Sequence, residues 1–160
     1  MSDFRRLSDQ ELADMALRLR ALEWPRDPDD VPAIAAAFDW TVESLREMGA
    51  RLGTRFGIAT GNFEFEEGRA VHVRAAVCSD IDRESAEERA WLQDVFAESV
   101  EAVSAALGPP THRLPGETPE VRWRGENSTV SVLKYSVIVD IALSTNEYID
   151  EYDRDVYQEL

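Results

Sequence analysis

The chain has 160 residues, and its 17 Lys and Arg against 32 Asp and Glu give a formal net charge of −15. A chain of this length can bury one ordinary hydrophobic core, and 44% of its residues are hydrophobic, so we expect residues 1–160 to form a single domain. The negative charge excludes the functions of a basic protein, binding to nucleic acid or to an anionic membrane, because like charges repel.

Two helices are predicted near the start of the chain. Ser8 precedes Glu11 by three residues, with Leu7 just before and Leu12 just after, which is the pattern of a capping box with a hydrophobic staple. Apolar residues at helical spacing then predict a helix over residues 9–22, which Trp24-Pro25 ends. After an acidic turn at residues 27–30, a second, short helix is predicted over residues 32–38.

The next segment, residues 40–56, is ambiguous. Its apolar residues approximate helical spacing, but Gly49 and Gly53 would each cost about 1 kcal/mol inside a helix. A hairpin that turns at residues 47–49 is equally compatible with the pattern. From Phe63 the alternation of apolar residues predicts two antiparallel strands, over residues 63–65 and 71–77, joined by a turn at residues 66–68.

The second half contains the longest predicted helix. It starts at Asp82 or Ser85 and ends at Gly108-Pro109-Pro110, with a broad apolar stripe between. A loop follows, and then three short strands over residues 121–124, 129–133 and 137–143. Ile149, Tyr152 and Val156 predict a terminal helix that packs loosely over the sheet. This order indicates an α+β fold, in which an antiparallel sheet of about five or more strands packs, on one face, against the long helix and the N-terminal helices.

Few residues point to chemistry. Catalysis by Ser or Cys needs a nearby base, and neither His72 nor His112 has a catalytic motif around it. Two histidines forty residues apart and the single Cys78 do not have the spacing of a zinc site. We therefore expect no enzyme activity, no metal and no cofactor. One cysteine without a partner, no apolar run long enough for a membrane span and no leader at the start favour a cytoplasmic protein.

The most distinctive short string is Arg122-Trp123-Arg124. Two guanidinium groups that flank an indole could stack or bind a carboxylate. Strand alternation favours a structural interpretation instead, in which Trp123 belongs to the core and the arginines point outward to pair with acids.

Most of the excess acidic charge lies after residue 60, and it forms two candidate binding surfaces. One is the outer face of the long helix and the other is the C-terminal segment. The candidate partner-binding residues are Glu84, Glu87, Glu88, Asp94, Glu98 and Glu101 in the first, and Tyr148, Asp150, Glu151, Asp153 and Asp155 in the second.

Several of these strings occur together in a known pattern. Trp24, Trp40, the segments 93–97 (QDVFA) and 107–110 (LGPP), Arg113, and the segments 115–116 and 121–125 (VRWRG) resemble an uncharacterised actinobacterial family, a domain of unknown function. The resemblance extends over nearly the whole chain. It implies strands in residues 40–56, and a small cytoplasmic protein from the neighbourhood of secreted toxins, with an immunity or chaperone-like role. It carries no catalytic residue.

Three hypotheses follow for function. The first is a non-enzymatic immunity protein whose acidic surface blocks the active site of a cognate basic toxin, with association speeded by charge. The second is a dimeric secretion chaperone for an effector protein. The third is an enzyme or small-ligand binder, which would require a polar pocket that holds several acids.

Overall fold

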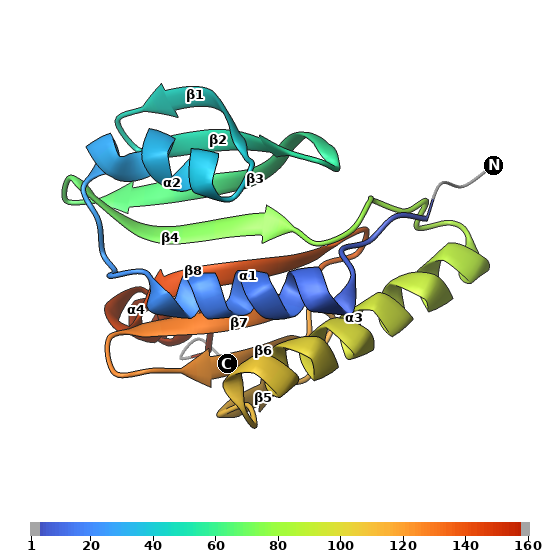
Figure 1. The fold of residues 1–160 in the computed structure, drawn as a ribbon. Coiled ribbons are helices and arrows are strands. Elements are labelled where there is room, and N and C mark those ends of the chain that lie inside the picture. Colours follow the sequence, from blue (N-terminus) through green and yellow to red (C-terminus); the bar gives the residue numbers. More distant parts are fainter. Residues whose placement is uncertain (1–3, 158–160) are drawn as a thin grey trace.

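The computed structural model describes residues 4–157, with side chains up to Asp155. Four α-helices and eight strands follow one another along this part of the chain (Figure 1). The helices are α1 (Asp9–Ala21), α2 (Val31–Ala37), α3 (Ala86–Leu107) and α4 (Asn146–Tyr157), with a 3-10 turn at Pro28–Asp30 before α2. The strands are β1 (Thr41–Arg46), β2 (Gly49–Thr54), β3 (Gly57–Glu66), β4 (Arg69–Ala76), β5 (His112–Leu114), β6 (Glu120–Arg124), β7 (Ser128–Lys134) and β8 (Val139–Thr145).

All eight strands form one antiparallel sheet in the order β1-β2-β3-β4-β8-β7-β6-β5. The chain builds β1 to β4 first, and after α3 it adds the second group of strands, so that β8 pairs with β4 at the centre. The predicted α+β class, with its antiparallel sheet, long helix and N-terminal helices, is confirmed.

The helix starts follow the predicted caps. The Ser8 hydroxyl accepts from the Glu11 amide (3.1 Å), and the Glu11 carboxylate accepts from the Ser8 amide (2.9 Å), so α1 begins with a complete capping box. Of the two predicted starts of α3, the structure uses Ser85, whose hydroxyl accepts from the Glu88 amide.

Residues 40–56 form the hairpin β1–β2 and not a helix. Gly49 lies where β2 crosses close to β3, and a Cβ at this position would come within 2.3 Å of the Phe63 carbonyl oxygen. The glycine that argues against a helix is therefore the residue that allows close strand pairing.

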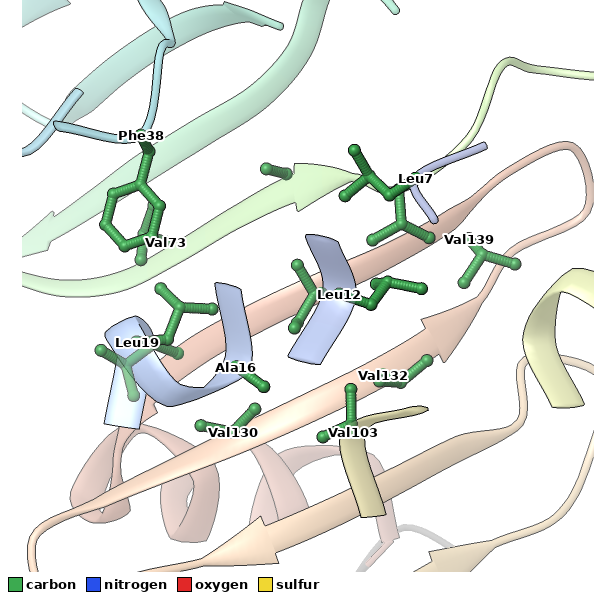
Figure 2. Packing of buried hydrophobic residues seen from close by; sticks show 14 of the residues in the cluster. Leu7, Leu12, Ala16, Leu19, Phe38, Val73, Val103, Val130, Val132 and Val139 are labelled. Carbon is green, nitrogen blue, oxygen red and sulfur yellow. The ribbon is translucent and has the colours of Figure 1, made fainter. Parts of the chain in front are cut away.

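The hydrophobic core lies between one face of the sheet and the helices α1, α2 and α3. Leu12, Ala16 and Leu19 of α1 project towards Val130 and Val132 of β7 (Figure 2). Val103 of α3 extends the same layer (Figure 2). These side chains are at most 1% exposed, so this layer supplies much of the apolar burial that stabilises the fold.

Three expectations about the second half of the chain are wrong. The first is that residues 111–120 form only a loop, because His112–Leu114 pair with β6 as the edge strand β5. The second is that the sheet is covered on one face. Helix α4 lies behind the sheet, on the face opposite α1 and α3 (Figure 1), and Ile149 is 5% exposed, so the terminal helix is packed. The Val156 side chain lies outside the described residues.

The third error concerns Arg122. Trp123 is in the core as predicted, 2% exposed, and its indole Nε1 donates to the Gly108 carbonyl (2.9 Å). Arg122 lies on the other face of β6, but α4 covers that face, and Arg122 is 3% exposed. Only Arg124 points to solvent, as predicted for both arginines, whereas the predicted pairing with acids is confirmed for both.

We predict that Trp123→Ala lowers the free energy of unfolding by about 3–5 kcal/mol, because it removes a buried indole and leaves a cavity. Urea denaturation measures the loss. The matched control is Trp91→Ala, since Trp91 is partly buried and stacks on the exposed Phe4, and we expect a clearly smaller loss there. Equal losses for the two variants would contradict the placement of Trp123 at the centre of the core.

Candidate functional site

The face of the sheet under α4 is lined by polar side chains. Strand register places Glu64 of β3 beside His72 of β4, and His72 beside Ser144 of β8. On the other side of β8, Ser131 of β7 lies next to Arg122 of β6. We call this surface the polar face. Its members are Asn62, Glu64, His72, Arg74, Glu120, Arg122, Thr129, Ser131, Asp140 and Ser144.

Arg122 joins the polar face to α4. Its Nε donates to Glu120 (2.5 Å), and its two terminal nitrogens donate to both carboxylate oxygens of Asp153 in α4 (2.8 and 2.9 Å). Burial alone would lower the pKa of Arg122, but these hydrogen bonds and charges raise it above its usual value. Arg122 is therefore a buried cation that pairs with the buried Glu120 and with the half-buried Asp153.

A second group connects three strands with the start of α4. His72 Nδ1 lies 2.7 Å from Ser144 Oγ, and the imidazole stacks on Tyr148, with ring centroids 4.6 Å apart. The Tyr148 hydroxyl donates to Glu64 (2.7 Å). Burial lowers the pKa of His72 to about 4, with Glu64 opposing the shift and Arg74 adding to it. The imidazole is consequently neutral at pH 7.

A cavity of about 220 Å³ lies between the polar face and α4. Ser131 lines it, is 2% exposed, and has an Oγ atom without a hydrogen-bond partner among the described residues. Tyr152 also lines the cavity and is 46% exposed, so the cavity opens to solvent beside it. Its other lining residues include Glu64, His72, Arg74, Glu120, Arg122, Leu133, Tyr135, Tyr148 and Ile149.

Arg74 and Asp140 form a further pair at this cavity. Arg74 lines the wall and donates to Asp140 (2.7 Å), which is 1% exposed. Burial raises the pKa of Asp140 in spite of Arg74. Burial, with the charge of Asp140 as the next cause, raises the pKa of the neighbouring Tyr135 to about 12. Tyr135 therefore keeps its proton and can donate a hydrogen bond at neutral pH.

Five of the six acidic residues predicted on the long helix face solvent, although Glu84 lies just before α3 begins. Glu84, Glu87, Asp94, Glu98 and Glu101 are exposed. Glu88 is half-buried, and its carboxylate accepts from the Asp82 amide. We call Glu87, Asp94, Glu98 and Glu101 the acidic stripe of α3, because their spacings of seven, four and three residues place them along one side of the helix.

The acidic residues of the C-terminal segment are placed differently. Tyr148 is half-buried, Asp153 binds Arg122, and Asp150 binds Arg124 through both oxygens (2.8 and 3.1 Å). Glu151 and Asp155 are exposed. Because α4 and α3 cover opposite faces of the sheet (Figure 1), the structure does not bring the two predicted acidic surfaces together.

A groove of about 330 Å³ lies between α1 and α3 at the acidic stripe. Its walls carry Asp9, Glu98 and Glu101, and its floor is formed by small alanine side chains. Arg6 forms ion pairs with both Asp9 and Glu98. This pairing shows that a guanidinium group fits between the two helices.

The remaining candidates carry no catalytic arrangement. Cys78 is fully buried, and burial raises the pKa of its thiol to about 11, so the nucleophilic thiolate is disfavoured. His112 is exposed on the edge strand β5. Between residues 4 and 157 there is no group of three or more His, Cys, Asp or Glu side chains that could hold a metal ion. Within the same range, no helix has the length and apolar character of a membrane span.

The polar face was missed by the sequence analysis, although a signal for it exists. Polar residues alternate with apolar ones on the same strands that build the core, as in Glu120-Val121-Arg122-Trp123 and Thr129-Val130-Ser131-Val132. Such alternation is typical of a sheet with one wet face. What converts the wet face into a buried one is α4, whose apolar residues are few.

We predict that Arg122→Ala lowers the free energy of unfolding by about 3–5 kcal/mol, because Glu120, 8% exposed, loses its cationic partner. Arg124→Ala is the control, since its pair with Asp150 is exposed on both sides and should contribute less than about 1 kcal/mol. Urea denaturation of both variants measures the two losses in the free energy of unfolding. Small and equal losses would contradict the buried role of Arg122.

We predict that stability falls with acidification through His72. Its pKa is about 4 in the folded chain against 6.5 in the unfolded one, so the unfolded chain binds more protons between these values. The stability that neutral His72 contributes is present above pH 6.5 and is lost as the pH falls towards 4.

Between pH 7 and pH 5, the free energy of unfolding of the wild type should therefore drop by about 2 kcal/mol more than that of His72→Gln. Urea melts at the two pH values measure this difference. Parallel pH profiles for the two proteins would show that His72 does not carry the effect.

The comparisons with known proteins place this architecture in a family without assigning it a function. Searches of curated proteins and of solved structures give no significant match. A family model matches residues 10–145, which ends at the last residue of β8, so the sheet lies inside the matched region and α4 lies outside it. The chain belongs to DUF6301, a family of unknown function.

Proposed function

We propose that this chain is a non-enzymatic binding protein. It binds a basic partner protein through the groove between α1 and α3 and the acidic stripe beside that groove. The observation that carries the proposal is the lining of the groove, where the carboxylate of Glu101, unpaired among the described residues, lies among small alanine side chains, beside Asp9 and Glu98, which pair with Arg6. An arginine or lysine of a partner would find there both opposite charge and room for its alkyl chain.

The charge of α3 supports this surface. Within residues 86–107 the helix has five acidic residues and one basic residue, Arg89, and Arg89 donates to the backbone carbonyl of Arg83. Glu87, Asp94 and Glu101 form no ion pair with any described residue. Unpaired carboxylates along a rigid helix steer a cationic protein into contact, and the net charge of −15 strengthens the attraction.

The polar face supports binding over catalysis. His72 and Ser144 are within hydrogen-bond distance, as a base and a nucleophile would be. However, an imidazole with a pKa of about 4 is a weak base at neutral pH. Glu64, which could orient the imidazole, is hydrogen-bonded to Tyr148 instead. The contact between His72 and Ser144 therefore serves to satisfy polar groups of the polar face beneath α4.

The resemblance described above suggests the class of partner. A cytoplasmic immunity protein protects its producer by covering the active site of a cognate toxin, and toxins that act on nucleic acid present basic surfaces to their substrate. We propose a partner of this kind for the groove and the acidic stripe. Of the acidic residues predicted to bind, those of α3 then contact the partner, while Asp150 and Asp153 hold α4 on the sheet.

The test is association with the product of the adjacent gene, measured by surface plasmon resonance at low and at physiological salt. We predict that the triple variant Glu87→Lys, Asp94→Lys, Glu101→Lys associates on the order of tenfold or more slowly than the wild type at low salt, because the steering charge is reversed. In cells, the same variant should protect less well against the neighbouring toxin.

A matched control carries the same change of net charge on α4, on the opposite side of the sheet (Figure 1), through Glu147→Lys, Glu151→Lys and Asp155→Lys, all at exposed positions. We expect it to associate almost as fast as the wild type. Equal slowing of both variants would show that only total charge matters and would contradict a defined surface. Binding to an unfolded segment by a dimer would instead support the secretion-chaperone hypothesis.

A further inference from the structure

The cavity beneath α4 is separate from the groove between α1 and α3, since the two lie on opposite faces of the sheet (Figure 1). Its volume of about 220 Å³ equals that of about seven molecules of liquid water. It is smaller than the pockets of about 300–1,000 Å³ that take drug-sized ligands. The cavity therefore suits a compact molecule.

One polar group in the wall has no partner. The Oγ atom of Ser131 is buried, lines the cavity, and makes no hydrogen bond to any described residue. Buried hydroxyl groups are nearly always hydrogen-bonded, because an unsatisfied one costs the free energy of its lost hydration. Ser131 thus marks a position at which a molecule in the cavity would be bound.

The charges around the cavity decide which kind of molecule fits. Two guanidinium groups lie in the wall, but Arg74 is already paired with Asp140, and Arg122 with both Glu120 and Asp153. An anion would have to compete with these carboxylates for the same donors. Four carboxylates, those of Glu64, Glu120, Asp140 and Asp153, thus face two guanidinium groups, which leaves a local excess of negative charge.

Glu64 is the carboxylate that lacks a counterion. It lines the cavity and accepts a hydrogen bond from Tyr148, but it forms no ion pair within residues 4–157. A partly buried carboxylate without a cation is costly, and a cation placed beside it gains strength from the low dielectric of the site.

The other walls are aromatic and apolar. Tyr135, Tyr148 and Tyr152 line the cavity together with Leu133 and Ile149. Tyrosine rings attract cations through their electron-rich faces, and such contacts are strongest where water is excluded. Tyr152, partly in solvent, stands at the entrance.

We propose that the cavity beneath α4 binds a small organic cation, an alkylammonium or arylalkylammonium ion. Glu64 provides the counterion, Ser131 provides a hydrogen bond, and the three tyrosines provide the walls. The binding is non-covalent and is independent of the docking surface on α1 and α3.

Three probes of the same shape test the charge of the ligand: benzylammonium, benzyl alcohol and benzoate. Isothermal titration calorimetry and thermal unfolding are measured with each at constant ionic strength. We expect benzylammonium to bind and to raise the melting temperature, with an affinity on the order of tenfold or more above that of the other two. Equal binding of the three, or no binding of benzylammonium at tens of millimolar, would overturn the proposal.

Two variants with the same net charge test the place of binding. Glu64→Gln removes the counterion, and we expect it to weaken benzylammonium binding about tenfold or more. Glu66→Gln lies on the same strand but is exposed and outside the cavity, so its affinity should stay within about twofold of wild type. Equal affinities for the two variants would show that the cation binds elsewhere, as a diffuse counterion.

If Glu64→Gln proves too unstable to titrate, Tyr135→Phe provides a second measurement. It keeps the ring and removes only a hydroxyl from the wall, so benzylammonium should still bind to this control. Ala142→Leu is the test variant, because its larger side chain fills the cavity from β8, and it should lose binding. Retained affinity in Ala142→Leu, with native circular dichroism, would likewise overturn the site.

Discussion

Alternation of polar and apolar residues along the strands that follow α3 is the constraint on which the rest of this structure depends. On β6 and β7, Val121, Trp123, Val130 and Val132 face the core, while the residues between them face α4. A slip of one residue in register would place charged and hydroxyl side chains against the apolar layer of α1 and α3, at a prohibitive cost in desolvation. The composition of the polar face therefore also fixes the register in which the strands pair.

A polar face that becomes buried must then satisfy its own hydrogen bonds, and this explains how α4 is held. The helix has few apolar residues, and among its described side chains Ile149 is the well-buried apolar one. Its remaining attachment is polar, through Asp153 on Arg122 and Tyr148 on Glu64 and His72. Such contacts are specific in direction but gain little net free energy. We infer that α4 is oriented by its polar pairs more than it is stabilised by them.

The sequence predicted features that depend on one segment and missed features that depend on contacts between distant segments. Local signals were sufficient where one segment determines its own structure, as at the capping box of Ser8 and Glu11 and the core position of Trp123. The ambiguity of residues 40–56 was resolved by contact between Gly49 and β3, which no local pattern contains. Arg122 was misplaced for a related reason. Its strand position was read correctly, but its burial depends on Asp153, 31 residues further along the chain. The contact of the terminal helix with the sheet was predicted, but the candidate cavity was not, because it depends on which side chains of α4 and of the strands beneath it meet there.

The two proposed sites share one sign of charge but respond to it differently. The acidic stripe of α3 is exposed, so its field acts over roughly the Debye length, about 8 Å at physiological ionic strength, and weakens as salt is added. The carboxylates around the cavity are buried or half-buried, and salt screens such groups less than exposed ones. A protein partner that approaches α3 is thus selected by long-range attraction, whereas a small cation beneath α4 is selected by contact with Glu64 and the tyrosine rings. Because the sheet separates the two surfaces, each can hold its own ligand without displacing the other.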